Sequence, residues 1–455
     1  MFPVSHRADH GVENLMGDYL ALMMFPALLV ALFMGFPVAF SMMGVALFFG
    51  LITFDTAVIF QFVQKTDAVA SNFVLAAVPL FIFMGSMLER SGIAEKLFEA
   101  VHLWTRRLPG GLAIGTIIMC VIFAASTGVI GATETVVGLL AIPVMMKYAY
   151  DKGLISGTIC AGGSLGTIIP PSVVVVVLGP VADVSVGDLF VGMIFPGLIM
   201  AGFYIAYILI RCTINPKVGP VLPRSDDEPS LIEKLRITLF ALAPPVAMIA
   251  AVLGSIMFGF AAPTEAAALG ALGSILLAVI YKQFTLSILR EAVLKTLTVT
   301  CMIILILLGG NMFAGVFVGS GGVSVAEELI QNADLTPWLT LAVFLGICFL
   351  AGFVLDWISV LLIFIPVFMP IVKSLGYDPV WFCVMFLVVI QTSYLTPPMA
   401  PAIFYLRGIS PPEITLQHMF KGVIPFIILQ LMCLVIVGWF PQVVLWLPAQ
   451  LLGFK

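Results

Sequence analysis

Two proline-proline pairs, each preceded by hydroxyl side chains, are the residues of this sequence best suited to binding an ion. The first pair ends the stretch Gly162–Ser172 (GGSLGTIIPPS), and the second ends Thr392–Pro398 (TSYLTPP). Proline lacks an amide hydrogen and disfavours the α conformation in the residue before it, so a helix that reaches either pair must stop. The carbonyl oxygens left free at such a helix end, together with the hydroxyls, suit a cation such as Na⁺.

Each pair should also start a new helix. We expect one helix to end near Gly166 with the next beginning at Pro171, and a second helix to end near Thr396 with the next beginning at Pro398. The first amides of a helix have no intrahelical partner and carry a partial positive charge, so they suit a carboxylate. The sequence therefore brings cation-binding and anion-binding groups to the same two places.

Composition indicates that these groups lie inside a membrane. Hydrophobic residues make up 62% of the chain and charged residues 10%, and the mean hydropathy is +1.19. A soluble domain carries about 25% charged residues. The net charge of −4 gives no indication of a nucleic-acid partner, and the seven cysteines show no C-x-x-C spacing, which argues against disulfides and zinc. The chain is predicted to be a polytopic membrane protein in contact with lipid.

Apolar segments of about 17–25 residues can cross a bilayer. We expect them at 19–35, 38–54, 73–89, 112–126, 133–148, 154–180, 189–211, 236–260, 264–281, 296–318, 337–353, 358–373, 380–406 and 422–447. Residues 1–18 form an N-terminal tail, read as uncleaved, and the proline-rich segment 213–235 is a linker that divides the chain into halves.

The two halves repeat one another. Pro170 and Pro397 are 227 positions apart, and further matches follow in the same order, such as Ile142-Pro143 with Ile365-Pro366. Broken helices at matched positions of two repeats are typical of the binding site of a secondary transporter. A single break is more often a kink, but a pair at matched positions favours function.

Charges indicate that the repeats are inverted. The loop that carries Arg90, Lys96, Arg106 and Arg107 should be cytoplasmic, whereas its counterpart, residues 319–337, has acidic residues and no Lys or Arg. The sequence therefore predicts an all-α polytopic membrane protein with two inverted-topology repeats, 19–212 and 236–455, on either side of a cytoplasmic linker.

Each repeat should hold about five transmembrane helices and one re-entrant hairpin, because inversion requires an odd number of crossings. The predicted hairpins are 112–148 and 337–373, and the broken helices are 154–180 and 380–406.

An anion would be held where the helix N-termini converge. The predicted contacts are Thr133, Pro171, Ser172 and Pro398. Lys and Arg lie only at the ends of the predicted spans and not in their interior, so dipoles, hydroxyls and bound cations must supply the positive charge. Glu134 is an acid at membrane depth and therefore a functional candidate, with helix capping as the alternative. For Ser126, Thr127, Thr167 and Thr396, the alternative is a hydrogen bond to a carbonyl of the same helix.

The chain resembles the large membrane subunit of the tripartite ATP-independent periplasmic (TRAP) transporters over nearly its whole length, from about Leu20 to Trp439. The segments that carry the resemblance are Val78–Gly85, Ser164–Ser172, Pro263–Ala268, Gly376–Val380 and Leu395–Pro398. They lie on both sides of the linker, so the resemblance covers both repeats.

This resemblance implies a Na⁺-driven uptake system in the bacterial inner membrane that moves its substrate by an elevator mechanism. The implied partners are a small four-helix membrane subunit and a periplasmic substrate-binding protein, and the implied substrate is a small organic acid such as a C4-dicarboxylate or sialic acid. Two or more Na⁺ ions would be transported. The family's sodium sites map onto Ser126, Thr127 and Gly128 with Gly166 and Thr167, and onto Gly352 and Asp356 with Thr396 and Met399.

Two departures from the family pattern affect the site. Tyr394 and Ala400 stand where the family usually has glycine around Leu-Thr-Pro-Pro. Tyr394 is expected to line the substrate site, and the two departures leave the substrate size and the exact second sodium site open. A stand-alone, ion-coupled dicarboxylate carrier is the alternative function. An enzyme is not expected, because no histidine lies inside a span and no H-E-x-x-H motif occurs.

Overall fold

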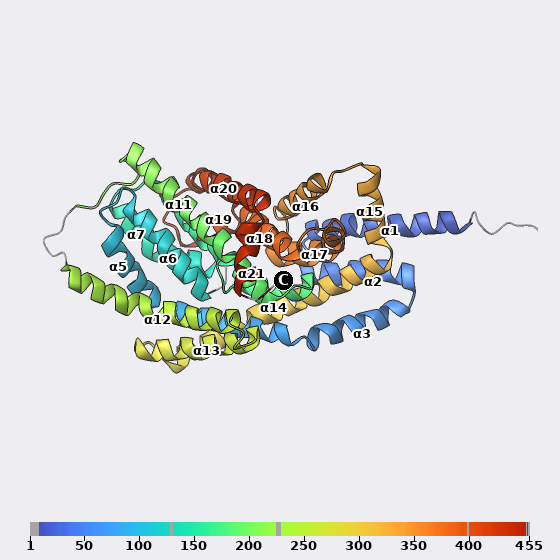
Figure 1. Ribbon diagram of the computed structural model, residues 1–455, viewed down its shortest axis with the longest axis horizontal. Helices are drawn as coiled ribbons and strands as arrows, with labels where there is room; N and C mark the ends of the chain where they lie inside the picture. The colour runs from blue at the N-terminus through green and yellow to red at the C-terminus, as the bar shows by residue number, and fades with distance from the viewer. Residues whose placement is uncertain (1–8, 128–130, 224–228, 398–399, 452, 454–455) are drawn as a thin grey trace, which may run out of the picture. The chain divides into compact units, whose positions relative to one another are not determined.

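The computed structural model describes residues 9–127, 131–223, 229–397, 400–451 and 453, without the side chains of residues 9–19, 126, 127 and 132. Every regular element in these residues is a helix (Figure 1). Six helices are long and apolar enough to cross a membrane alone, and several shorter apolar helices accompany them. The prediction of an all-α polytopic membrane protein is confirmed.

Most of the helices occupy segments that hydropathy predicts. In the first half they are α1 (Asp9–Phe33), α2 (Val38–Phe54), α3 (Ala57–Ala70), η1 (Phe73–Ala76), α4 (Ala77–Glu89), α5 (Ile93–Thr105), α6 (Gly111–Thr127), α7 (Ala132–Lys147), α8 (Lys152–Ser164), η2 (Leu165–Thr167), α9 (Val173–Ala182), α10 (Val186–Gly192) and α11 (Ile194–Ile214). In the second half they are α12 (Leu231–Met257), α13 (Pro263–Ile280), α14 (Leu286–Gly319), α15 (Gly322–Asn332), α16 (Pro337–Ala351), α17 (Trp357–Ser374), α18 (Pro379–Leu395), α19 (Pro401–Ile409), α20 (Leu416–Trp439) and α21 (Gln442–Leu451).

Hydropathy alone missed or misplaced several elements. The helices α3, α5 and α15 escaped it because charged residues interrupt their apolar faces. The helix α14 begins at Leu286, ten residues before the apolar run that was predicted to start at 296. The last predicted segment, 422–447, is broken between α20 and α21, where Pro441 cannot continue the helix.

Both predicted broken helices are present, but each second helix starts later than expected. The helix α9 begins at Val173 rather than Pro171, because Ser172 is still extended, with φ −124° and ψ 132°. The helix α19 begins at Pro401 rather than Pro398, directly after Ala400 in the left-handed region at φ 35°. Proline is well suited to the first position of a helix, so Pro401 fixes this start.

The repeat is visible in the backbone as well as in the sequence. Five positions with positive φ in the first half have a counterpart in the second half, in the same order and at nearly the spacing of the two proline pairs. These pairs are Gly35 with Gly259, Asp55 with Lys282, Gly92 with Gly321, Gly110 with Asp334, and Ala149 with Gly376. Because positive φ is rare outside glycine, their recurrence in order indicates two copies of one chain path.

The chain forms two compact units. Unit 1 comprises Met1–Phe73, Thr300–Cys348 and Leu355–Pro379, and unit 2 comprises Val74–Val299, Phe349–Val354 and Val380–Lys455. Neither unit corresponds to one half of the sequence. In unit 2, α4 of the first half packs along α13 of the second half, and Met87 of α4 and Ala278 of α13 form a buried core with Ala292 of α14.

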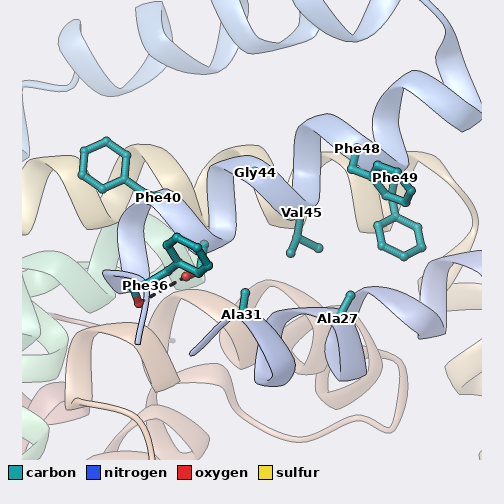
Figure 2. Close-up of a pocket in the computed structure, with 9 residues that line it drawn as sticks. Ala27, Ala31, Phe36, Phe40, Gly44, Val45, Phe48 and Phe49 are labelled. Carbon is teal, nitrogen blue, oxygen red and sulfur yellow. Dashed lines mark hydrogen bonds between the residues drawn. The ribbon is translucent and has the colours of Figure 1, made fainter. Parts of the chain in front are cut away.

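Unit 1 contains an apolar pocket of about 340 Å³ between α1 and α2. Figure 2 shows phenylalanine side chains of α2 and the small residues Ala27 and Ala31 of α1 around it. Ser41 is the polar side chain in its lining, and its hydroxyl already donates to the carbonyls of Phe36 and Pro37. This pocket offers nothing that would hold a carboxylate.

Glycines let α8 approach α20 closely in unit 2. A Cβ on Gly157 would lie 2.2 Å from the carbonyl oxygen of Gly422, and a Cβ on Gly422 would lie 2.1 Å from that of Gly153. Small residues four apart are the usual means by which membrane helices bring their backbones together. The position of α8, and hence of the first break, depends on this contact.

We therefore expect Gly157→Ala to destabilise the protein, because the new methyl group meets backbone that cannot turn aside. Overpacking of this kind costs about 1–3 kcal/mol. The measurement is thermal unfolding of the purified protein in detergent. Gly202→Ala in α11 is the matched control, since a Cβ there meets nothing within 4 Å, and it should leave stability unchanged or slightly raised. Equal melting temperatures for the two variants would contradict the assignment of this contact.

Candidate functional site

The first broken helix, up to Gly179, and the helix that leads into the second break are buried in unit 2. Every residue from Leu154 to Gly179 is buried, as is every residue from Trp381 to Leu395. Helix ends at membrane depth need protein or a ligand around their backbone groups, because lipid cannot form hydrogen bonds with them. The breaks meet this requirement through the helices packed around them, including α6, α7 and α20.

Four buried polar side chains connect the two breaks. Gln391 of α18 donates to the hydroxyl of Ser164 on α8 at 3.1 Å, and Gln430 of α20 donates to the same hydroxyl at 3.4 Å. Gln430 also donates to the hydroxyl of Tyr204 on α11 at 2.8 Å. None of the four side chains is exposed. We call Ser164, Tyr204, Gln391 and Gln430 the polar network.

The polar network lies at the junction of the two repeats. Ser164 and Gln391 are 227 positions apart, the same spacing as the two proline pairs. Residues at matched positions of two repeats can touch only where the repeats meet, so this hydrogen bond lies at their contact. The network therefore fixes the ends of α8 and α18 relative to each other.

A second buried contact joins the first hairpin to α18. The hydroxyl of Tyr394 donates to Oε2 of Glu134 at 3.3 Å, and Glu134 is fully buried. Gly163 of α8 makes room for this side chain, since a Cβ there would lie 2.0 Å from Cγ of Glu134. Glu134 is the third residue of α7, but no side-chain hydrogen bond caps this helix at Gly131. The carboxylate therefore reaches across to α18 instead of capping its own helix.

The predicted anion contacts in the described chain lie in unit 2. Thr133, Pro171, Ser172 and Tyr394 are all buried there, whereas Pro398 lies outside the described residues. Ser172 occupies the cap position of α9 without capping it, and its hydroxyl is buried with no hydrogen-bond partner among the described residues. An unsatisfied buried hydroxyl at this break is a group that a ligand could satisfy.

The residues of the first implied sodium site are only partly described. Gly166 and Thr167 form the 3₁₀ turn η2 that ends α8, and the hydroxyl of Thr167 donates to the carbonyl of Ser164 at 2.9 Å. Ser126 and Thr127 end α6, but their side chains, and Gly128 entirely, lie outside the described residues.

The residues of the second implied sodium site are described separately in each unit. Gly352 and Thr396 belong to unit 2, where the hydroxyl of Ser393 donates to the carbonyl of Phe349 at 3.3 Å and so brings the end of α16 to α18. The hydroxyl of Thr396 donates to the carbonyl of Thr392 at 2.7 Å. Asp356 belongs to unit 1, and Met399 lies outside the described residues.

Asp356 acts as a helix cap within unit 1. Its carboxylate accepts hydrogen bonds from the amide of Ile358 at 3.2 Å and from the hydroxyl of Ser359. Among the described residues, no three His, Cys, Asp or Glu side chains lie together as a metal site would need. Cation binding at the breaks would therefore rely on carbonyl and hydroxyl oxygens.

Sequence reasoning missed the polar network and the partner of Glu134. Glutamine inside an apolar span is unusual, so Gln391 and Gln430 were the available signal. The residues that they contact lie more than 200 positions away, and no local pattern reveals such pairs.

The linker is attached to the base of the first hairpin. The amide of Gly110 donates to the carbonyl of Gly219 at 3.0 Å, and the amide of Asp151 donates to that of Val218 at 2.9 Å. The hydroxyl of Tyr150 donates to the carbonyl of Pro220 at 3.1 Å, and burial raises the pKa of Tyr150 to about 12. Through these hydrogen bonds, this part of the linker is fixed to the loops that precede α6 and follow α7.

Removing one hydroxyl from the polar network should destabilise the protein. In Tyr204→Phe, the side-chain amide of Gln430 loses its shortest hydrogen bond. Because the site is buried, water does not replace the lost partner, and the loss costs about 1–3 kcal/mol of stability. Tyr207→Phe, one turn along α11 at a half-buried position beside Arg211, is the control and should change little. Thermal unfolding in detergent compares the two, and an equal loss in both would argue against the network.

The chain is similar to known transporter proteins over nearly its whole length. Residues 25–443 match the family described as the tripartite ATP-independent periplasmic transporter, DctM component. The C4-dicarboxylate TRAP transporter large permease protein DctM of Rhodobacter capsulatus is 30% identical over 95% of this chain and 99% of that protein. The sialic acid TRAP transporter large permease protein SiaM of Vibrio cholerae is 29% identical over 93% of this chain and 97% of that protein.

Solved structures of transporters share the fold. The YdaH transporter of Alcanivorax borkumensis matches with a TM-score of 0.61 at 13% identity, covering 93% of this chain and 98% of that chain. MtrF of Neisseria gonorrhoeae matches with a TM-score of 0.59 at 13% identity, covering 86% of this chain and 84% of that chain. The relatives are transporter permease subunits and not enzymes. The chain belongs to the DctM family and is the multi-pass large permease subunit of a TRAP secondary transporter.

Proposed function

We propose that this permease imports a small organic acid, delivered by a periplasmic binding protein, in symport with Na⁺. The observation that carries the proposal is the pair of buried breaks in unit 2, which present helix ends and hydroxyls where no basic residue is available. No Lys or Arg occurs from Leu154 to Ala182 or from Pro379 to Leu406. Relatives are named for C4-dicarboxylates, sialic acid and 2,3-diketo-L-gulonate, all of which are carboxylates.

The anion would be bound at the start of α9, next to Ser172. The first amides of α9 carry about half a positive charge, and the unpartnered hydroxyl of Ser172 adds a donor at the same point. Partial charges alone compensate a carboxylate poorly at membrane depth. Two or more Na⁺ ions bound at the ends of α6 and α8 and at those of α16 and α18 would supply the remaining charge. Substrate affinity should then depend on Na⁺.

The remaining features of the proposal concern the assembly. The two repeats would be inverted in the bacterial inner membrane, with the 213–235 linker on the cytoplasmic side. An elevator mechanism would carry the buried breaks across the membrane as one body. A small four-helix membrane subunit would enlarge the static part, and the periplasmic binding protein would deliver the substrate. The family description, which names a tripartite periplasmic transporter, supports these partners.

The test is uptake into proteoliposomes that contain this chain and its small membrane subunit. We expect uptake of a labelled C4-dicarboxylate or another small carboxylate only when an inward Na⁺ gradient and the loaded binding protein are both supplied. A K⁺ gradient of the same size is the control. Uptake without the binding protein would favour the alternative, a stand-alone carrier, and uptake that ignores Na⁺ would refute the coupling.

The position of the substrate can be tested at Ser172. In Ser172→Asp, a fixed negative charge would lie where the substrate's carboxylate is expected, so transport should be abolished while the protein still folds and inserts. Ser172→Ala, which adds no charge, should only weaken substrate binding, by about two- to tenfold for one lost hydrogen bond. If Ser172 served only as a helix cap, Asp would cap equally well and uptake would be normal. Yield and monodispersity in detergent control for folding.

A further inference from the structure

Glu134 is a buried carboxylate that the sodium and substrate positions above do not use. It lies at the start of α7 in unit 2 and has no exposed surface. Its Oε2 accepts the hydrogen bond from Tyr394, but its Oε1 has no partner among the described residues. A carboxylate has several acceptor positions, so one long hydrogen bond of 3.3 Å leaves most of them unsatisfied.

The groups that surround Glu134 are neutral. The titratable side chains that face it are Cys120 of α6, Cys160 of α8, Tyr394 of α18 and Tyr405 of α19. None of them can carry a positive charge. Gly163 of α8 contributes only the space that the side chain occupies. In the described part of unit 2, no basic group is available to pair with this carboxylate.

The magnitudes show that the helix alone cannot stabilise an ionised Glu134. A carboxylate near a helix N-terminus gains only a small stabilisation from the dipole. Removing an ion from water costs more than this gain, even after the protein relaxes around the ion. The deficit has to be covered by a cation that comes from solution. Intramembrane acids of this kind mark ion or proton positions in transporters.

We propose that Glu134 binds one monovalent cation, Na⁺ or a proton, as an additional coupling site of the carrier. The cation would bind at Oε1 while the hydroxyl of Tyr394 holds Oε2. Tyr394 thus positions the carboxylate, which explains why a tyrosine is tolerated at the end of α18. The site rests on the proposed function, because it assigns a further ion to the same transport cycle.

The site also makes substrate binding depend on cation binding. A substrate carboxylate at the start of α9 and an ionised Glu134 would repel each other, since both positions are buried in unit 2. A cation on Glu134 removes this repulsion, so cation binding favours substrate binding. By reciprocity, the substrate must raise the affinity for that cation by the same factor.

The decisive experiment compares the wild type with Glu134→Gln, which keeps the size and an acceptor for Tyr394 but carries no charge. The transport stoichiometry is measured from the reversal potential of substrate flux, under separately imposed Na⁺ and H⁺ gradients, in proteoliposomes. We expect Glu134→Gln to move one cation fewer per substrate than the wild type. Loss of the Na⁺ component identifies Na⁺ as the ligand, and loss of the H⁺ component identifies a proton. An unchanged stoichiometry would overturn the proposal.

A binding measurement covers the case in which Glu134→Gln no longer transports. The melting temperature of the purified protein is measured in detergent against Na⁺ concentration at several pH values, without substrate. The wild type should show a cation-dependent stabilisation. Glu134→Gln should lose the part of it that Glu134 contributes, while the Na⁺ positions at the breaks still respond, and in Tyr394→Phe that part should need about tenfold or more cation. Glu99→Gln, an exposed carboxylate on α5, is the control and should match the wild type.

Identical cation responses in Glu134→Gln and the wild type would overturn the site, whatever the uptake assay shows. The proposed function fails on a different result, namely wild-type uptake that ignores Na⁺. The two proposals can therefore be refuted separately.

Discussion

The architecture depends on the inability of lipid to form hydrogen bonds with a protein backbone. Two helices of this chain end in the middle of apolar segments, and each leaves carbonyl and amide groups that must be satisfied within the protein. Unit 2 achieves this by surrounding α8 and α18 so completely that no residue from Leu154 to Gly179 is exposed. The glycine contact between α8 and α20 and the polar network both follow from this requirement, because each draws covering helices close to a break.

The same constraint explains how the site combines opposite charges without a basic residue. The helix ends supply partial charges of both signs, and the buried polar side chains near them are nearly all neutral. Glu134 is the exception, because no described side chain would balance its charge if it were ionised. In a carrier built in this way, the binding of one ligand affects the binding of the others, because each bound ion changes the electrostatic free energy of binding the next ion.

Much of the fold could be predicted from the sequence, because its determinants are local. Apolar segment length located most of the helices, and the proline pairs located both breaks. The starts of α9 and α19 were missed because they depend on the extended Ser172 and the left-handed Ala400, which are set by tertiary packing. The candidate site was only partly predictable. Hydroxyls next to prolines indicated where ligands could bind, but the contacts of Gln430 with Tyr204 and of Tyr394 with Glu134 join distant segments.

The packing of α4 against α13 has a consequence for the synthesis of this protein. The core that these helices share, around Met87 and Ala278, combines residues from both halves of the sequence. About 170 residues separate the end of α4 from the start of α13. At about 5–20 residues per second, α4 must wait roughly ten to thirty seconds for its partner. During that interval the face of α4 that carries Met87 has to be shielded by the insertion machinery or by lipid, so the first half of the chain cannot complete its fold before the second half has been made.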